Sequence, residues 1–302
     1  MKLLRYAFLV LITTFLMGIA FPIGKLGLAY APPFLLMGIR FVLAGGLLAL
    51  AISRKQRSRP QGKKQWVQAA AIGVCQTAGV MGCAYFSMQW ISSGESSILI
   101  SINPLLVILF GAVMNGTRYR GRQWIGVAVG FIGVMVAFGF RLGMQAGTLI
   151  GFAGAVFFAL ATLLTKRWGG GFDKLTLAAY QMLAGGIVLL ALSAITEHPS
   201  FQVNFESVTA LLCLIILCSI VQFSLWYKLL SQGDPGKTSS YLFLMPIFGV
   251  LTSWALLGEQ VNQAVYIGGA IVCIGIFLVN WETKSDKKGM ASIPRAVKPI
   301  AK

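Results

Sequence analysis

Apolar residues in this chain fall into long runs that are separated by short polar segments. A run of about 20 apolar residues is long enough to cross a lipid bilayer as an α-helix. The pattern predicts ten such helices and little other regular structure. They cover roughly residues 6–25, 33–52, 66–87, 94–114, 123–140, 147–165, 175–195, 207–229, 237–257 and 263–281. We therefore expect an all-α polytopic membrane protein with ten transmembrane helices.

The second half of the chain repeats the first. The stretch Gly94–Ala137 returns 142 positions later, without a gap, as Gly236–Val279, and Pro104 then coincides with Pro246. Because each half holds an odd number of helices, the second half enters the membrane from the opposite side. The pattern predicts two inverted five-helix repeats around a central cavity. Their boundaries are 1–142 and 143–281, followed by a basic, disordered cytoplasmic tail at 282–302.

The first apolar run has a second interpretation. It follows Lys2 and Arg5 and passes through the small-residue stretch Gly18–Ala20, as a cleaved signal peptide would. However, the run continues beyond those residues, and the repeat needs five helices in each half. We therefore count it as the first transmembrane helix.

Composition supports the membrane assignment and excludes other classes. Hydrophobic residues make up 57% of the 302 and charged residues only 11%, and the mean hydropathy is +0.79. Soluble domains carry roughly 25% charged residues. The net charge of +17 would suit nucleic acid, but the basic residues lie between apolar runs, so no nucleic-acid partner is expected. The five cysteines show no paired spacing and His198 is the only histidine, so we predict no metal site and no cofactor.

Basic residues are distributed asymmetrically about the predicted helices. All but three of the 25 lysines and arginines lie on alternate segments that include the amino terminus and the tail; the exceptions are Lys25, Arg40 and Arg141. Positive residues stay on the cytoplasmic side. Both termini are therefore expected in the cytoplasm, and the protein in the bacterial cytoplasmic membrane.

Several motifs resemble a known family of transporters. They are Arg40-Phe41 before a small-residue stretch, SSGESSILISINPLL at 92–106, and GKTSSYLFLMPIFGVLTSWALLGEQ at 236–260. Together they are similar to the drug/metabolite transporter (DMT) superfamily, in its ten-helix EamA-type branch, over nearly all of 6–281. The resemblance implies secondary transport of a small metabolite or drug, usually outward, through a central cavity lined by both halves.

One position departs from the family pattern. Thr117 stands in the first half where the family often has an acidic residue, which the second half keeps as Glu259. This departure argues against a coupling role for Glu259 and favours a role in capping a turn.

Charged residues inside the bilayer are costly, so each is a functional candidate. Lys25 closes the first helix, Arg40 lies about two turns into the second, and Glu95 opens the fourth, all toward the external side. If they converge, they form a network of charge +1 that suits a carboxylate or another anionic group. Alternatively, Lys25 reaches the membrane interface and Glu95 only caps its helix.

Glu95 is also the candidate proton carrier, because no other acidic residue lies inside a predicted span. Its equivalent in the inverted half is Lys237, so Lys25, Glu95 and Lys237 are the coupling or gating candidates. Protons are accordingly a candidate coupling ion. The alternative is that Glu95 and Lys237 each satisfy only a helix end.

The remaining candidates are prolines and polar or aromatic side chains. Pro104 and Pro246 lie mid-span at equivalent positions and should kink their helices, exposing backbone carbonyls to the cavity or serving only packing. The candidate substrate contacts are Arg40, Gln76, Tyr85, Gln222, Trp226 and Tyr227. Aromatic residues near helix ends are also common as interface anchors, which is the alternative for the two tyrosines.

The leading interpretation is a secondary active transporter, not an enzyme, that exports small metabolites such as amino acids by alternating access. Its partners would be the lipid bilayer, a small-molecule substrate and protons. A multidrug efflux carrier is the alternative within transport. A membrane-embedded non-transport protein or lipid-modifying enzyme is the alternative from another class, but the sequence has no cluster of His, Asp and Glu to support that chemistry.

Overall fold

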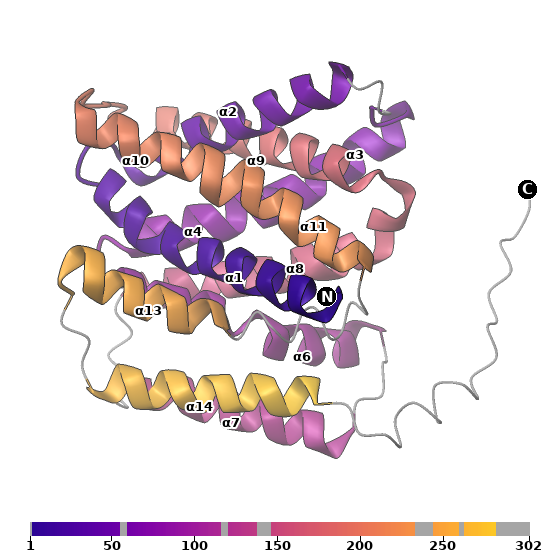
Figure 1. Ribbon diagram of the computed structural model, residues 1–302, viewed down its shortest axis with the longest axis vertical. Coiled ribbons are helices and arrows are strands. Elements are labelled where there is room, and N and C mark those ends of the chain that lie inside the picture. The colour runs from indigo at the N-terminus through magenta and orange to yellow at the C-terminus, as the bar shows by residue number, and fades with distance from the viewer. Residues whose placement is uncertain are drawn as a thin grey trace, which may run out of the picture.

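A computed structural model of the protein describes residues 2–54, 59–115, 120–137, 146–232, 244–259 and 263–281. Within these ranges all regular structure is helical, and the helices stack in successive layers (Figure 1). The predicted all-α polytopic architecture is confirmed. The predicted tail, 282–302, lies outside the described residues.

The first half contributes five apolar segments, two of which are built from several helices. They are α1 (Lys2–Gly27), α2 (Pro33–Arg54), a third span of α3 (Gly62–Gly73), η1 (Val74–Gly79) and α4 (Val80–Ser87), a fourth of α5 (Ser93–Ile100) and α6 (Asn103–Asn115), and α7 (Gly121–Ala137).

The second half follows the same order. It comprises α8 (Ala146–Trp168), the short 3₁₀ turn η2 (Gly169–Gly171), α9 (Lys174–Thr196), a composite span of α10 (Phe205–Ile215), η3 (Ile216–Val221) and α11 (Gln222–Gln232), then α13 (Leu244–Leu257) and α14 (Gln263–Asn280).

Seven segments of the described chain are long and apolar enough to cross a membrane. They are Tyr6–Gly27, Pro33–Arg54, Gly62–Ser87, Ser93–Val113, Ala146–Gly171, Lys174–Thr196 and Phe205–Trp226. The other three predicted spans correspond to shorter apolar helices, Gly121–Ala137, Leu244–Leu257 and Gln263–Gly275. The number ten is therefore a prediction, and part of the ninth predicted span lies outside the described residues.

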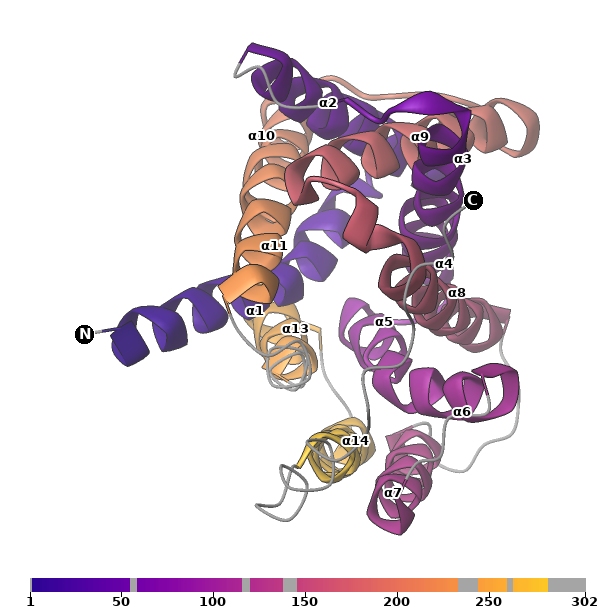
Figure 2. The ribbon, with the colours of Figure 1, turned by 90° about the vertical axis from the view of Figure 1, so that its right-hand side faces the viewer.

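Corresponding helices of the two halves pack against each other. The second helices, α2 and α9, run together, as do the fifth, α7 and α14 (Figures 1 and 2). Small residues allow this approach: a Cβ atom at Gly45 would lie 2.8 Å from the carbonyl oxygen of Ala179, and one at Gly133 would lie 2.8 Å from that of Gly268. Because a membrane offers little hydrophobic drive for helix association, such close backbone contact is a main source of packing energy.

The third and eighth spans each contain a π-helical segment of six residues, η1 and η3. Their bounds, 74–79 and 216–221, differ by the same 142 positions as the sequence repeat. A π segment inserts one residue into the helical turn and redirects the side chains that follow, often at functional sites. Hydropathy alone predicts two uninterrupted helices here, so these segments are a finding of the structure.

Loops gather at the two ends of the bundle. At one end Gln65 Nε2 donates to the carbonyl oxygen of Gly171 at 3.2 Å, joining the two loops predicted to be cytoplasmic. At the other end the amide of Gln202 donates to the carbonyl oxygen of Tyr30 at 2.9 Å. We call these the Gly171 end and the Tyr30 end.

Candidate functional site

Arg40 is the centre of the candidate site. It lies seven residues after the start of α2 and is only 1% exposed. Its Nε donates to Ser219 Oγ at 2.9 Å, its Nη1 to the Tyr85 hydroxyl at 3.1 Å, and its Nη2 to the carbonyl oxygen of Cys218 at 2.8 Å. The acceptors in the described chain are thus neutral dipoles, and no carboxylate lies within ion-pair distance there.

A guanidinium group has five N–H donors. Besides the three bonds above, Nη1 of Arg40 also faces Met37 Sδ at 3.7 Å, which accounts for four. The second hydrogen on Nη2 has no acceptor among the described residues. Burying a charge without a counter-charge is costly, so this arrangement leaves Arg40 able to accept an anionic partner.

Two aromatic rings flank the guanidinium. Its central carbon lies 4.7 Å from the ring centre of Phe41 and 6.0 Å from that of Tyr85. The electron-rich faces of such rings attract cations, so they offset part of the cost of burial. They do not neutralise the charge.

Tyr85 connects Arg40 to the first helix. Its hydroxyl donates to the carbonyl oxygen of Ala20 at 2.6 Å while accepting from Arg40. Pro22 lies inside α1 two residues further on, and sequence reasoning had not singled it out. Since proline has no N–H, it leaves the carbonyl of Gly18 without its helical donor. A polar backbone atom of α1, two residues before Ala20, is therefore left without its helical hydrogen bond.

The π segment η3 positions the partner from the other half. Ser219 Oγ donates to the carbonyl oxygen of Leu214, five residues earlier, at 2.9 Å, and this fixes its lone pairs toward Arg40. Cys218 presents its carbonyl oxygen beside it. Arg40 therefore joins α1, α2 and α4 of the first half to η3 of the second.

A second polar cluster lies at the Tyr30 end. Lys25 Nζ donates to the carbonyl oxygens of Met88 and Ile91, the latter at 3.3 Å. Glu95 forms a capping box with Ser92: its carboxylate accepts from the Ser92 amide at 2.8 Å, and its own amide donates to Ser92 Oγ at 3.1 Å.

Glu259 belongs to this cluster as well. Its carboxylate accepts from the Ser93 amide at 3.2 Å and from Ser93 Oγ at 2.9 Å, so it caps the start of α5 from the other half. Lys25 interacts electrostatically with both Glu259 and Glu95. The cluster therefore holds two carboxylates and one ammonium group.

The structure thus separates Arg40 from Lys25 and Glu95, which the sequence placed at one depth. Lys25 and Glu95 lie together, but the hydrogen-bond partners of Arg40 are Tyr85, Ser219 and Cys218. The reason is geometric. The Arg40 side chain extends toward η3, whereas Lys25 reaches the turn after α4, so Glu259 and not Arg40 completes the outer cluster.

The other predicted contacts lie near the two π segments. Gln222 directly follows η3 and is 5% exposed, and Gln76 is half-buried within η1. Neither makes a hydrogen bond with another described residue. Trp226 is half-buried one turn further along α11. The Tyr227 side chain and all of Lys237 lie outside the described residues.

The prolines occupy different helical contexts. The fourth span is interrupted at Ser101–Ile102, just before Pro104, and the buried Oδ1 of Asn103 has no hydrogen-bond partner there. Pro246 is the third residue of α13, and the residues immediately before α13 lie outside the described chain.

Sequence reasoning missed Gln181. It lies on α9, is 0% exposed, and accepts from Thr77 Oγ1 at 2.8 Å through its Oε1. A signal was present, because Gln181 is the one amide side chain in the apolar run 175–195.

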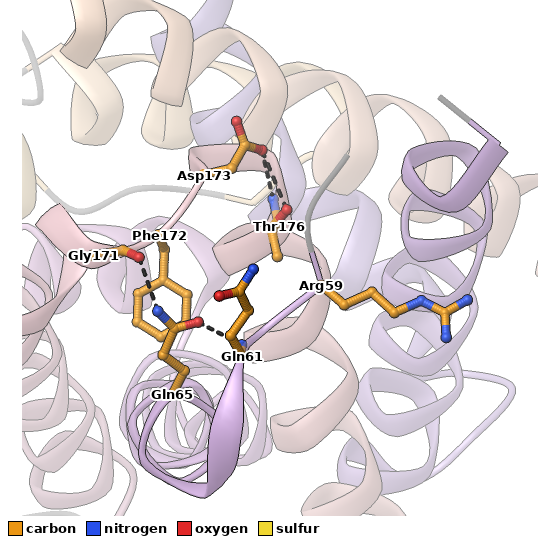
Figure 3. Close-up of a pocket in the computed structure, with 7 residues that line it drawn as sticks. All are labelled: Arg59, Gln61, Gln65, Gly171, Phe172, Asp173 and Thr176. Carbon is orange, nitrogen blue, oxygen red and sulfur yellow. Dashed lines mark hydrogen bonds between the residues drawn. The ribbon is translucent and has the colours of Figure 1, made fainter. Parts of the chain in front are cut away.

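A cavity of about 160 Å³ opens at the Gly171 end (Figure 3), and Arg40 is not among the residues that line it. It is lined by Arg59, Gln61, Gln65, Gly171, Phe172, Asp173 and Thr176. Asp173 Oδ1 accepts from the Thr176 amide at 3.2 Å, as an N-cap of α9. None of the residues proposed from the sequence lines this cavity.

Comparisons with known proteins agree along most of the chain. The model of the EamA-like transporter family matches residues 4–139 and again 145–281. The chain is 27% identical to the uncharacterized transporter YvbV of Bacillus subtilis over 96% of both chains, and 24% identical to the uncharacterized inner membrane transporter YedA of Escherichia coli over 87% of this chain and 86% of that one. A solved crystal structure shares the fold with a TM-score of 0.67 at 21% identity, covering 90% of this chain and 96% of the other. This chain belongs to the EamA-like transporter family.

Proposed function

We propose that this transporter exports small organic solutes that carry a carboxylate, amino acids being the model class, by alternating access. The observation that carries the proposal is the buried guanidinium of Arg40, which has only neutral partners within the described chain. A carboxylate would supply the missing charge and accept the free Nη2 hydrogen. Arginine suits this role because its planar fork matches the two oxygens of a carboxylate.

Alternating access is supported by where the partners of Arg40 come from. Tyr85 belongs to the first half and Ser219 to the second, so relative motion of the halves would change the coordination of Arg40. All three side chains are at most 1% exposed, which fits a site occluded from both sides in this conformation. Two inverted repeats, 1–142 and 143–281, provide a physical basis for exchanging two such conformations.

Proton coupling through Glu95 is the second part of the proposal. Its half-buried carboxylate lies at the Tyr30 end, close to Lys25 and Glu259. Glu95 caps α5 beside Lys25, which binds the turn after α4, so a proton gained or lost at Glu95 would change the charge of this cluster. We propose that export exchanges a proton at Glu95 for the outward-moving solute.

Multidrug efflux is less well supported. The aromatic rings of Phe41 and Tyr85 would suit flat, apolar molecules, but the common cationic drugs would meet the charge of Arg40. A solute that bears a carboxylate can pair with the Arg40 charge and also pack against the aromatic rings.

Flux into proteoliposomes tests the proposal. The panel pairs ¹⁴C-labelled L-amino acids with their carboxamides and includes a cationic dye, with and without a pH gradient. We expect transport of carboxylates, about a hundredfold preference over the amides, and acceleration by the pH gradient. Arg40→Met should abolish transport yet insert normally, since replacing a buried charge by an apolar chain of similar length is often tolerated. Unimpaired transport by this variant, or equal transport of the amides, would refute the role of Arg40.

A further inference from the structure

The two π segments hold equivalent hydroxyl groups. Thr77 is the fourth residue of η1 and Ser219 the fourth of η3, and they are 142 positions apart. Both are buried, at 1% and 0% exposure. Each hydroxyl is hydrogen-bonded to a polar side chain on the second helix of the opposite half: Ser219 to Arg40 on α2, and Thr77 to Gln181 on α9.

Gln181 and Arg40 are therefore counterparts. Arg40 lies seven residues after Pro33, where α2 begins, and Gln181 lies seven residues after Lys174, where α9 begins. Helix α2 begins at the Tyr30 end and α9 at the Gly171 end. The two residues thus occupy equivalent depths measured from opposite sides of the bundle.

The amide of Gln181 has an unused polar atom. Its Oε1 accepts from Thr77 at 2.8 Å, but the buried Nε2 has no hydrogen-bond partner. Exchanging the two ends of the amide would leave the oxygen without a partner instead, so one atom stays unpaired either way. An unpaired buried polar group is costly, so a ligand atom that accepts from Nε2 would be favoured here.

The backbone holds Gln181 closely in place. A Cβ atom at Gly73 would overlap the Gln181 carbonyl oxygen, and one at Gly185 would overlap both the Gly73 carbonyl oxygen and Thr77. Helix α9 is therefore in direct backbone contact with Gly73, the last residue of α3, and in close contact with the Thr77 side chain of η1. A leucine at 181 would fill the same space, so the polar group is not required for packing.

We propose that Gln181, held by Thr77, is a second substrate subsite on the cytoplasmic side, where it binds the carboxylate that Arg40 binds on the external side. This inference rests on the proposed function and adds to it one binding position for each side of the membrane. The Gln181 subsite is neutral and the Arg40 subsite is cationic. Solute entering from the cytoplasm would meet Gln181 first, at a position that binds it less tightly.

The test measures uptake from each face separately. Right-side-out and inverted membrane vesicles take up a mixture of ¹⁴C-labelled L-amino acids, and vesicles from cells without the protein give the background. In Gln181→Leu we expect the half-saturation concentration at the cytoplasmic face to rise about tenfold, the factor that one hydrogen bond of about 1.4 kcal/mol to a charged group provides. At the external face it should change less than twofold.

Ser193→Ala is the matched control. Ser193 lies on the same helix, is 1% exposed, and has a hydroxyl that likewise lacks a partner. Its removal should leave both half-saturation values unchanged. The exchange variant Arg40→Gln with Gln181→Arg should reverse the sidedness, so that the cytoplasmic face now binds more tightly.

The sidedness of the effect separates a subsite from a structural tie. If Gln181 serves only to join η1 to α9, Gln181→Leu affects both faces equally, and this result overturns the inference. A subsite predicts the sided effect whatever the change in melting temperature, because the substitution removes the unpaired Nε2 and also leaves the Thr77 hydroxyl without its acceptor. If the wild type takes up no amino acid from either face, the proposed function itself fails. If it does and Gln181→Leu behaves like the wild type, only the second subsite fails.

Discussion

The ring of Tyr85 on α4 packs so closely against Gly24 on α1 that a Cβ atom at position 24 would overlap the ring. The same tyrosine accepts a hydrogen bond from Arg40 and donates one to Ala20. Gly24 therefore sets the position of the hydroxyl that orients the guanidinium. Gly24 thus contributes to the site by leaving room for the Tyr85 ring.

The first prediction follows from this contact. Gly24→Ala should displace the Tyr85 ring, lengthen its hydrogen bond to Arg40, and reduce transport of ¹⁴C-labelled amino acids at least tenfold. Overpacking a buried contact costs about 1–3 kcal/mol, so a lower melting temperature in detergent is also expected. Gly46→Ala is the control, because a Cβ atom there would meet only Leu183 Cδ2 at 3.9 Å. Equal activity of the two variants would show that the fit of Tyr85 is unimportant.

The second prediction concerns Ser219, which accepts from Arg40 Nε and donates to the Leu214 carbonyl. Ser219→Ala leaves the Nε donor buried without an acceptor, at a cost of about 1–3 kcal/mol. We expect a lower melting temperature and a higher half-saturation concentration for carboxylate solutes. Ser219→Thr keeps the hydroxyl and should restore both. If Ser219→Ala melts and transports like the wild type, the contact with Arg40 does not form in the membrane.

Local rules predicted much of the fold. Length and hydropathy identify the apolar helices, because a helix that crosses lipid must be apolar along its whole length. The same rules give no warning of η1 and η3, since a π segment leaves the composition of the run unchanged and only rotates the side chains that follow. Pro22 shows the converse limit: it lies within one continuous helix, although proline usually marks an interruption.

The site was predicted less completely, and for a physical reason. Arg40 could be singled out because a charge inside a membrane is expensive. Its partners Ser219 and Cys218 lie nearly 180 positions further along, and neither spacing nor composition links them to it. Glu259 likewise caps α5 from a distance of 166 positions, a contact that only the folded chain reveals.

The third prediction separates two roles of Glu95. A glutamine at the third position can complete a capping box as glutamate does, but it cannot carry a proton. Glu95→Gln should therefore keep the melting temperature of the wild type and lose the acceleration of export by a pH gradient. Glu95→Ala should lose both, with about 1 kcal/mol of stability attributable to the cap. A pH gradient that still drives the Gln variant would exclude Glu95 as the proton carrier.

The fourth prediction concerns the contact between Tyr30 and Glu206 at the Tyr30 end. Hydrogen bonding to the Glu206 carboxylate raises the pKa of Tyr30 above its usual value of 10.0. A phenol must be protonated to donate, so the contact is fully formed below pH 10 and is lost as the pH rises through the raised pKa. Absorbance at 295 nm, compared between wild type and Tyr30→Phe, should show one late-titrating tyrosine. Glu206→Gln should return the pKa of Tyr30 toward 10. If the titration of Tyr30 is the same in this variant, the contact with Glu206 is contradicted.

The final prediction tests the orientation of the protein in the membrane, on which the external side of Arg40 and the cytoplasmic side of Gln181 depend. Gly170 and Ser200 are exposed residues in the loops before and after α9, so they should lie on opposite faces of the membrane. The five native cysteines lie in apolar helices and are half-buried or buried, and they should react poorly with a polar reagent. In intact cells a membrane-impermeant maleimide should label Ser200→Cys and spare Gly170→Cys, and permeabilised cells should allow both to react. If intact cells allow only Gly170→Cys to be labelled, the predicted topology is reversed, and Arg40 lies toward the cytoplasm and Gln181 toward the outside.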